Sequence, residues 1–219
     1  MILTNLYDDT AARLRSIGDW IWPLSLRLIL GYEFWTAGLT KFNGKNWFGG
    51  RIDSFPQPFK LFGGDFSWFA ATWGELVFSV MLIFGLFTRF AAFSLVVITV
   101  VAIMTIHWPA EYSGLSDLWQ GYSVSRVKVD DVFKGNFRIP LLFLIMLLPL
   151  VFHGGGKFSV DALLRFFTAR SGDHRRISDL QSVGLGFLVL TVPFIYMAPI
   201  FGFVFLGAAI LCFLVPRFS

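Results

Sequence analysis

The sequence predicts an all-α integral membrane protein, with a four-helix transmembrane core followed by a C-terminal apolar tail folded as a two-helix hairpin. Of the 219 residues, 56% are hydrophobic and only 15% are charged, whereas a soluble domain is usually about 25% charged. The segments 90–106 and 183–197 contain no charged residue, and a membrane-spanning helix needs about 20 mostly apolar residues. The chain also has 27 Phe and 8 Trp, side chains that suit lipid-facing surfaces and membrane interfaces.

The four spans of the predicted core follow one another with connections of very different length. They are expected at residues 20–40, 66–87, 90–106 and 137–152. The loop after the first span is aromatic and basic, which is typical of the membrane–water interface. Its residues of this kind are Trp47, Phe48, Arg51 and Phe55.

Short polar or glycine-rich segments are expected to end the helices of the core. Thr88 and Arg89 are predicted to form a tight turn that makes the second and third spans an antiparallel hairpin. Glycines 154–156 follow His153 and are expected to end the fourth span, since glycine readily adopts positive φ. In residues 158–167, apolar side chains recur at helical spacing opposite Asp161 and Arg165, which predicts an amphipathic helix lying on the membrane surface.

The apolar tail is too long to cross the membrane as one helix. Residues 183–215 would form a helix of about 50 Å, compared with a hydrocarbon core of about 30 Å. Pro193 and Pro199 bracket a break at residues 197–203, so we expect two short spans instead of one kinked helix.

These patterns predict four regions. Residues 1–19 form a cytoplasmic N-terminal segment, 20–168 the core with its interfacial helix, 169–182 a basic polar linker and 183–219 the transmembrane tail. Basic residues gather between 165 and 176, and positive charge close to a span is retained in the cytoplasm. We therefore expect a multi-pass membrane protein with both termini cytoplasmic and the polar loop 110–136 outside.

Charged residues at membrane depth are candidates for function, because burying one costs about 2.5 to 3.5 kcal/mol on insertion scales. Three are expected there: Arg27, Glu33 and Glu75. Arg27 shares a helix stripe with two glycines and is predicted to reach Glu75 and form an ion pair, while Glu33 is expected to be protonated or to meet another span. This layer is either a buried site for a ligand or proton, or an ion pair that fixes helix packing.

Further polar and aromatic residues are weaker candidates. Trp35 and Trp73 are predicted at the depth of the acids, where they either wall a pocket for a flat ring such as a quinone head group or pack against lipid. The helix-end candidates are Lys41, Arg89, His107 and His153. The two histidines are expected at opposite membrane faces, so we predict no metal site.

Composition argues against several classes of function. Cys212 is the only cysteine, which makes thiol chemistry and cysteine-ligated clusters improbable. The chain has neither a dinucleotide-binding glycine motif nor a pair of histidines placed across one haem, so no self-sufficient redox or catalytic motif is present. The basic residues lie in short loops between spans, which indicates membrane topology and no nucleic-acid partner.

The order of these motifs resembles the DoxX family of small bacterial membrane proteins with a four-helix core. The resemblance covers residues 26–163. It rests on Arg27-Leu28, Gly31, Phe34, Ala37-Gly38, Lys41, Glu75, Gly85-Leu86-Phe87-Thr88-Arg89, His107, Gly154–Gly156, Ser159 and Asp161. The family name refers to a subunit of a thiosulfate:quinone oxidoreductase, and other members are linked to membrane oxidoreductase assemblies or to gene clusters that make copper-binding modified peptides.

This resemblance leaves two functional hypotheses. The first is a membrane subunit or accessory of an oxidoreductase system that binds a quinone or another small apolar ligand, or docks a partner, around the charged layer. The second is a non-enzymatic scaffold or transporter-like component, for example in the maturation or handling of copper-binding peptides. The expected partners are the lipid bilayer and the proteins of such an assembly, and the sequence is compatible with a homo-oligomer.

Overall fold

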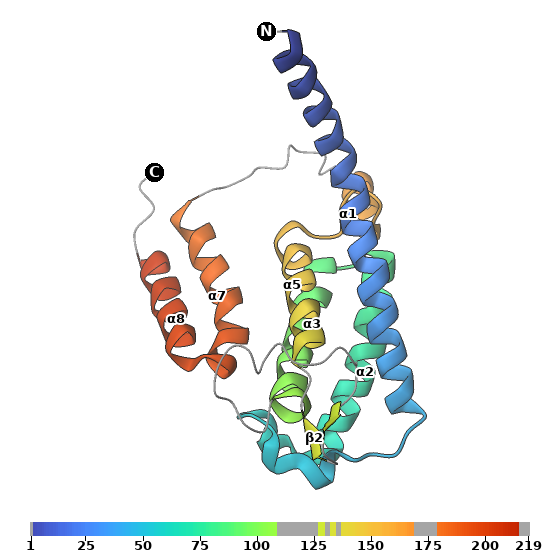
Figure 1. Ribbon diagram of the computed structural model, residues 1–219, viewed down its shortest axis with the longest axis vertical. Helices are drawn as coiled ribbons and strands as arrows, with labels where there is room; N and C mark the ends of the chain where they lie inside the picture. Colours follow the sequence, from blue (N-terminus) through green and yellow to red (C-terminus); the bar gives the residue numbers. More distant parts are fainter. Residues whose placement is uncertain (1, 109–126, 130–131, 135–136, 169–178, 215–219) are drawn as a thin grey trace. The chain divides into compact units, whose positions relative to one another are not determined.

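A computed structural model describes residues 2–108, 127–129, 132–134, 137–168 and 179–214 of the chain (Figure 1). The described residues are mostly helical, with one small antiparallel hairpin of strands β1 (Val127–Val129) and β2 (Val132–Lys134). This hairpin lies within the predicted polar loop 110–136, most of which is outside the described residues. The all-α class is therefore confirmed.

Several described helices are apolar enough to belong in a membrane. Three are also long enough to cross it, at Phe59–Phe84, Thr88–His107 and Leu180–Met197. Two shorter apolar helices are Arg138–His153 and Pro199–Leu214. The described helices thus agree with the predicted second and third spans, and the tail begins with a helix that is long enough to span.

The chain divides into two compact units that interleave along the sequence. The first unit comprises Met1–Lys45, Ala70–Leu95 and Ile145–Ser171. The second comprises Asn46–Phe69, Val96–Leu144 and Gly172–Ser219. All contacts described below lie within one unit or the other.

Helix α1 (Ile2–Phe42) runs without interruption from the predicted N-terminal segment through the predicted first span. The expected boundary at residues 19 and 20 is therefore not a helix end, and residues 11–15 before it are of types that favour helix. Unlike the other predicted spans, α1 carries Arg27 and Glu33, which lower its mean hydropathy. Its crossing of the membrane remains a prediction.

Helix α2 (Gly63–Phe84) packs antiparallel and very close to α1. A Cβ atom on Gly38 would lie 2.8 Å from Leu76 Cγ, and one on Gly31 would lie 3.2 Å from the Ser79 carbonyl oxygen. The first distance is shorter than real Cβ atoms show, and the second is tighter than most real Cβ contacts. The glycine stripe of α1 therefore faces α2, as the sequence predicts, since small residues let membrane helices approach.

The turn between α2 and α3 (Thr88–Ala102) differs from the prediction. Gly85 adopts a left-handed conformation with φ of 68°, its N–H bonds to the Leu82 carbonyl at 3.0 Å, and the Leu86 N–H bonds to the Met81 carbonyl at 2.8 Å. This pattern ends α2 as a Schellman motif. Thr88 and Arg89, which we expected in the turn, instead form the first turn of α3.

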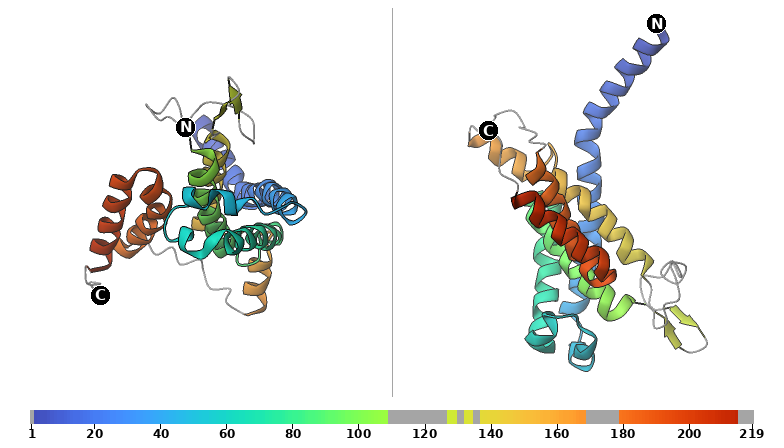
Figure 2. Two further views of the ribbon diagram at one scale, coloured as in Figure 1. Left: turned by 90° about the horizontal axis from the view of Figure 1, so that it is seen from below. Right: turned by 90° about the vertical axis from the view of Figure 1, so that its left-hand side faces the viewer.

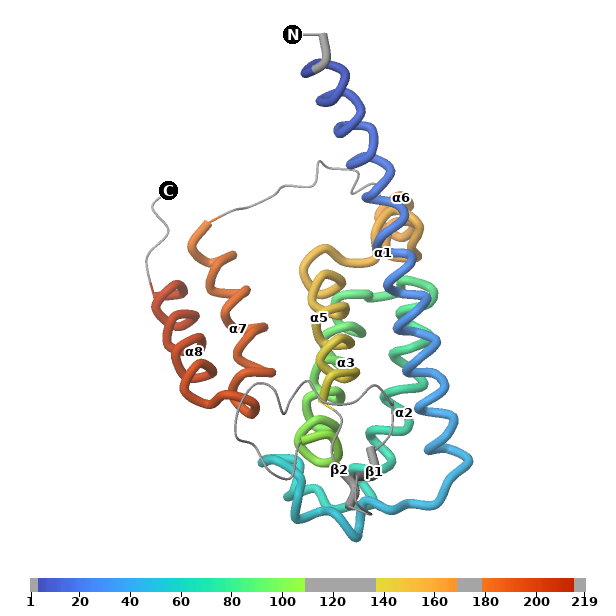
Figure 3. Tube along the Cα trace, viewed as in Figure 1, coloured from blue at the N-terminus to red at the C-terminus, as the bar shows by residue number. Residues whose placement is uncertain are grey.

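Helix α3 continues into a π-helical turn, η3 (Ile103–His107). Helix α5 (Arg138–His153) ends at the predicted glycines, two of which, Gly154 and Gly156, have positive φ. The amphipathic helix follows as α6 (Val160–Phe167), after a short segment beyond α5 (Figure 3). It begins two residues later than predicted, because the Ser159 side chain accepts a hydrogen bond from the Ala162 N–H and so forms the N-cap.

The segment between α1 and α2 contains two short 3₁₀ helices, η1 (Phe48–Ser54) and η2 (Phe59–Phe62). The rings of Trp47, Phe48, Phe55 and Trp68 contact one another edge-on or tilted, with centroids 4.7 to 5.9 Å apart. On the exposed side, Lys60 donates a hydrogen bond to Asp53, and this bond together with the lysine charge lowers the pKa of the Asp53 carboxyl.

The tail forms two helices, α7 (Leu180–Met197) and α8 (Pro199–Leu214), as the sequence predicts. They separate at Ala198, within the expected break, and pack against each other as a hairpin (Figure 2). Phe205 contacts the rings of Phe187 and Phe194, with centroids 5.7 and 5.1 Å away. The predicted linker 169–182 lies outside the described residues up to residue 178.

Candidate functional site

An ion pair between Lys41 and Glu75 joins the last turn of α1 to the middle of α2. The Lys41 ammonium lies 2.7 and 2.9 Å from the two carboxylate oxygens of Glu75. Only 7% of the Glu75 side chain and 18% of the Lys41 side chain are exposed. Because removing both charges from water is costly, the close bidentate contact is what makes their burial tolerable.

Arg27 does not pair with Glu75, contrary to the sequence prediction. Its side chain is buried and its guanidinium donates to three backbone carbonyls: Leu82 at 3.5 Å, Ile83 at 3.4 Å and Phe158. The first two carbonyls belong to the last turn of α2, whose carbonyls have no partner within the helix. Arg27 therefore caps the C-terminus of α2, where the helix dipole favours a positive charge.

The relative level of α1 and α2 explains this correction. The prediction took Trp20 as the inner end of the first span and counted depth in the membrane from there. Because α1 begins long before Trp20, this residue is not a helix end and gives no reference for depth. In the structure Gly38 lies against Leu76, so Glu75 is near the level of Gly38, about 16 Å along α1 from Arg27. Lys41 lies on the same stripe of α1, three residues beyond Gly38, and its long side chain reaches Glu75, so it takes the place that the prediction gave to Arg27.

Two further capping contacts join α3, α5 and α6 in the first unit. The Asp161 carboxylate accepts hydrogen bonds from the Phe87 N–H at 2.7 Å, the Thr88 N–H at 2.9 Å and the Thr88 hydroxyl at 2.7 Å. A carboxylate at this position satisfies the free amides at the N-terminus of α3 and suits its dipole. Arg89 donates to the carbonyls of Val151, at 2.8 Å, and Phe152, in the last turn of α5.

Asp161 was not among our predicted site residues. The sequence placed it on the polar face of an amphipathic helix, and its partners are backbone groups 73 and 74 residues away. The signal for its role was its position in the motif that resembles the DoxX family, after the three glycines. The Ser159 cap beside it belongs to the same motif.

The other predicted members of the charged layer do not join the ion pair. Glu33 is half-buried, and within the described residues its carboxylate makes no hydrogen bond or ion pair. Trp35 and Trp73 are 36% and 45% exposed. Trp73 contacts the Phe42 ring edge-on, with centroids 5.8 Å apart. The predicted role of both tryptophans as walls of a quinone pocket remains a prediction.

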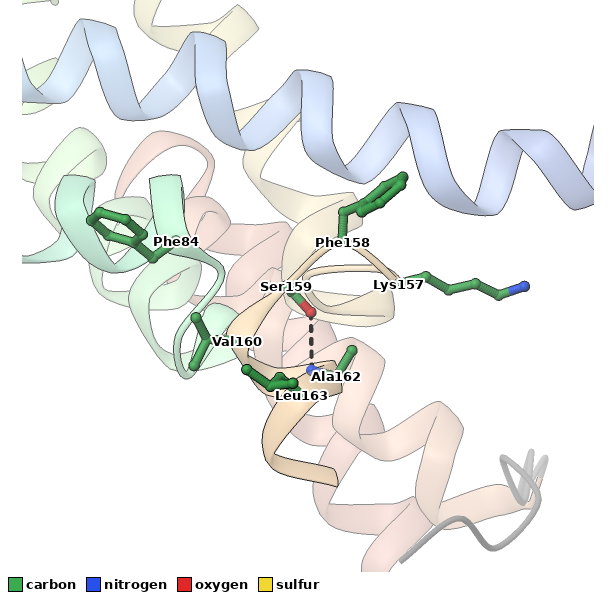
Figure 4. Close-up of a pocket in the computed structure, with 7 residues that line it drawn as sticks. All are labelled: Phe84, Lys157, Phe158, Ser159, Val160, Ala162 and Leu163. Atoms are coloured by element: carbon green, nitrogen blue, oxygen red, sulfur yellow. Dashed lines mark hydrogen bonds between the residues drawn. The ribbon is translucent and has the colours of Figure 1, made fainter. Parts of the chain in front are cut away.

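A shallow open depression of about 520 Å³ lies at the start of α6 (Figure 4). Phe84, Val160 and Leu163 form its apolar part, and Lys157 stands at the opposite end from Phe84 (Figure 4). The other lining residues are Phe158, Ser159 and Ala162. It contains none of the predicted site residues, although Ser159 belongs to the motif that resembles the DoxX family.

Comparison with known proteins identifies the family. The DoxX family model matches residues 22–108. A protein of Haemophilus influenzae, described as uncharacterized, is 36% identical over 153 residues, which cover 70% of this chain and 89% of that protein. The chain belongs to the DoxX family. No solved structure matches it significantly.

Most of the DoxX motif residues that the structure describes hold helices together. Gly31 and Gly38 allow α1 and α2 to approach, Lys41 and Glu75 join them at one level, and Arg27 caps α2. Gly85 gives the turn after α2. The contacts of these motif residues thus explain how the helices of this DoxX chain pack.

Two histidines of the DoxX chain, His107 and His153, lie at helix ends, as predicted. His107 ends η3 and His153 ends α5, where its ring contacts Trp22 edge-on with centroids 5.3 Å apart. Among the described residues, no group of three or more His, Cys, Asp or Glu side chains is arranged to hold a metal ion.

Proposed function

We propose that this DoxX protein is a non-enzymatic membrane scaffold, a component that holds a partner protein at the membrane in an oxidoreductase assembly or in the handling of copper-binding peptides. The observation that carries the proposal is that its motif charges are engaged with other groups of the same chain. Arg27 and Arg89 bond to carbonyls, Asp161 bonds to amides, and Lys41 bonds to Glu75.

Charges used in this way stabilise the bundle and are not displayed to a substrate. A catalytic acid or base needs access to the group that it protonates or deprotonates. The Asp161 carboxylate instead accepts three hydrogen bonds from Phe87 and Thr88, and the Arg27 side chain is enclosed by α1, α2 and the segment before α6. This pattern favours the scaffold hypothesis over the redox subunit.

Affinity purification of the full chain from its own host in a mild detergent tests the proposal. The eluate is analysed by mass spectrometry for proteins and modified peptides, by organic extraction for quinones, and by elemental analysis for copper. We expect a stoichiometric protein or peptide partner and no quinone above the level of an unrelated membrane protein purified in the same way. A stoichiometric quinone without a partner would contradict the scaffold.

A quinone-like ligand at the Lys41–Glu75 pair is the second candidate function. One observation favours it: the Thr72 hydroxyl is buried without a hydrogen-bond partner in the described chain and lies one turn of α2 before Glu75. Lys41 is also partly exposed, so its ammonium is accessible from one side. If the chain binds a quinone at this pair, Thr72→Val should lower the amount of co-extracted quinone. If it is only a scaffold, the amount should not change.

We also propose the membrane orientation with both termini in the cytoplasm. The basic residues Lys157 and Arg165 follow α5 closely and support it under the positive-inside rule. Cysteines introduced at Ser16, on the exposed part of α1, and at Ser54, at the exposed end of η1, test it with an impermeant thiol reagent on spheroplasts. We expect labelling of Ser54→Cys but not of Ser16→Cys, and the reverse pattern would mean the opposite orientation.

A further inference from the structure

The depression at the start of α6 combines an apolar floor with a positive charge at one end. Phe84, Val160 and Leu163 contribute the apolar surface, and Phe84 and Leu163 are 61% and 52% exposed. Lys157 stands at the other end (Figure 4). Since these residues come from the end of α2 and the beginning of α6, the two helices form one continuous surface.

The two ends of the depression lie at different levels along α1. Phe84 directly follows Leu82 and Ile83, whose carbonyls Arg27 contacts. The Lys157 ammonium lies 5.0 Å from the centre of the Trp20 ring, seven residues before Arg27. The depression therefore extends about 10 Å along the helix axis, with its apolar end toward the predicted membrane interior and its charged end at the start of the predicted span.

Lys157 is available to an external anion. Its side chain is exposed, and no carboxylate of the described residues lies within ion-pair distance of it. Trp20, against which it rests, is a residue type that favours the head-group level of a bilayer. A cation over an aromatic ring at that level is well placed for a lipid phosphate.

The remaining surface of α6 suits the same environment. Beyond the depression, its exposed side chains are large and apolar, with Phe166 and Phe167 at 74% and 73% exposed. Arg165 is exposed on the same helix and close enough to Arg89 for their charges to interact. A short helix with bulky apolar side chains and basic residues lies in the head-group region and is attracted to anionic lipids.

We propose that this depression is a binding site for an anionic phospholipid, with one acyl chain against Phe84, Val160 and Leu163 and the phosphate at Lys157. The order of apolar and charged surface along the depression matches the order of tail and head group in such a lipid. This proposal does not rest on the proposed scaffold function, because Lys157, Phe84, Val160 and Leu163, which would hold the lipid, take no part in the Lys41–Glu75 pair or in the capping bonds of Arg27, Arg89 and Asp161.

Native mass spectrometry of the full chain in a mild detergent tests the site. The protein is titrated with phosphatidylglycerol and, separately, with phosphatidylcholine of the same acyl chains. We expect phosphatidylglycerol to bind more tightly by about five-fold, the factor that corresponds to one lysine at an anionic lipid surface. Lys157→Gln should remove this preference, and Lys157→Arg should keep it.

Two controls make the result specific. Lys45→Gln removes an exposed lysine elsewhere in the first unit and should leave the preference unchanged. Ala162→Leu adds bulk to the depression without changing charge and should weaken the binding of both lipids. Equal binding of the two lipids by the parent protein would overturn the proposal, and so would an unchanged preference in Lys157→Gln or an equal loss in Lys45→Gln.

Discussion

The α1–α2 pair and the α7–α8 hairpin are both antiparallel helix pairs in an apolar chain, but different interactions hold them. In the first pair, glycine contacts are combined with the Lys41–Glu75 ion pair and with the Arg27 cap. In the second pair, contacts such as Gly184 with Cys212 and the ring contacts of Phe205 are apolar. The Thr191 hydroxyl bonds within its own helix.

This difference indicates what buried charge adds to a membrane helix pair. Apolar packing allows two helices to slide past each other, since many positions offer similar contacts. An ion pair or a capped helix end is satisfied only at one level, so displacement strands a charge or a carbonyl in a low-dielectric region. We infer that polar contacts fix the position of α1 along α2, whereas the contacts described here between α7 and α8 are apolar.

Replacing Arg27 is expected to lower the free energy of unfolding more than replacing another capping residue. Arg27→Met keeps the side-chain length but removes the donors to Ile83 and Phe158, and each buried carbonyl left without a partner costs about 1 to 3 kcal/mol, whereas the Leu82 carbonyl keeps its bond from the Gly85 N–H. We expect a loss of about 3 kcal/mol or more in the free energy of unfolding in bicelles, measured by steric trapping. Arg13→Met, on the exposed part of α1, is the control and should change it by less than about 0.5 kcal/mol.

Replacing Asp161 should have a smaller effect. Asp161→Ala removes the cap of α3, which is expected to cost about 1 to 2 kcal/mol. Hydrogen exchange should show faster exchange at the amides of Phe87 and Thr88 and unchanged exchange in α7. Equal protection in the variant and the parent would contradict the capping role.

Glycine substitutions compare the two helix pairs directly and should give effects of different size in the two pairs. Gly38→Ala forces a Cβ against Leu76 and is expected to destabilise by about 1 to 3 kcal/mol. Gly186→Ala, in α7, meets nothing within 4 Å and should be neutral or stabilise by about 0.5 to 1 kcal/mol. A similar result for both variants would mean that the close approach of α1 and α2 is not required.

Periodicity predicts much of this arrangement. It gives the helices, the break at Ala198, the helix-end positions of His107 and His153 and the direction in which the stripe of Gly31 and Gly38 faces. It does not give the level at which two helices meet, because α1 continues past the predicted start of its span. For that reason Arg27 was assigned the partner that Lys41 has.

The sequence pattern also could not predict the capping contacts. The partners of Arg27, Arg89 and Asp161 are mostly backbone groups, and every residue has these groups, so the pattern contains no complementary side chain to find. Only the position of Asp161 within the family motif indicated that it has a role.

A double-mutant cycle at Lys41 and Glu75 tests the central claim that buried motif charges stabilise the bundle. The free energy of unfolding is measured for the parent, Lys41→Met, Glu75→Gln and the double variant. Removing one partner of a buried pair should cost about 3 to 5 kcal/mol, and the double variant should recover most of that loss, since neither charge is then left alone. Additive losses without recovery in the double variant would contradict the claim.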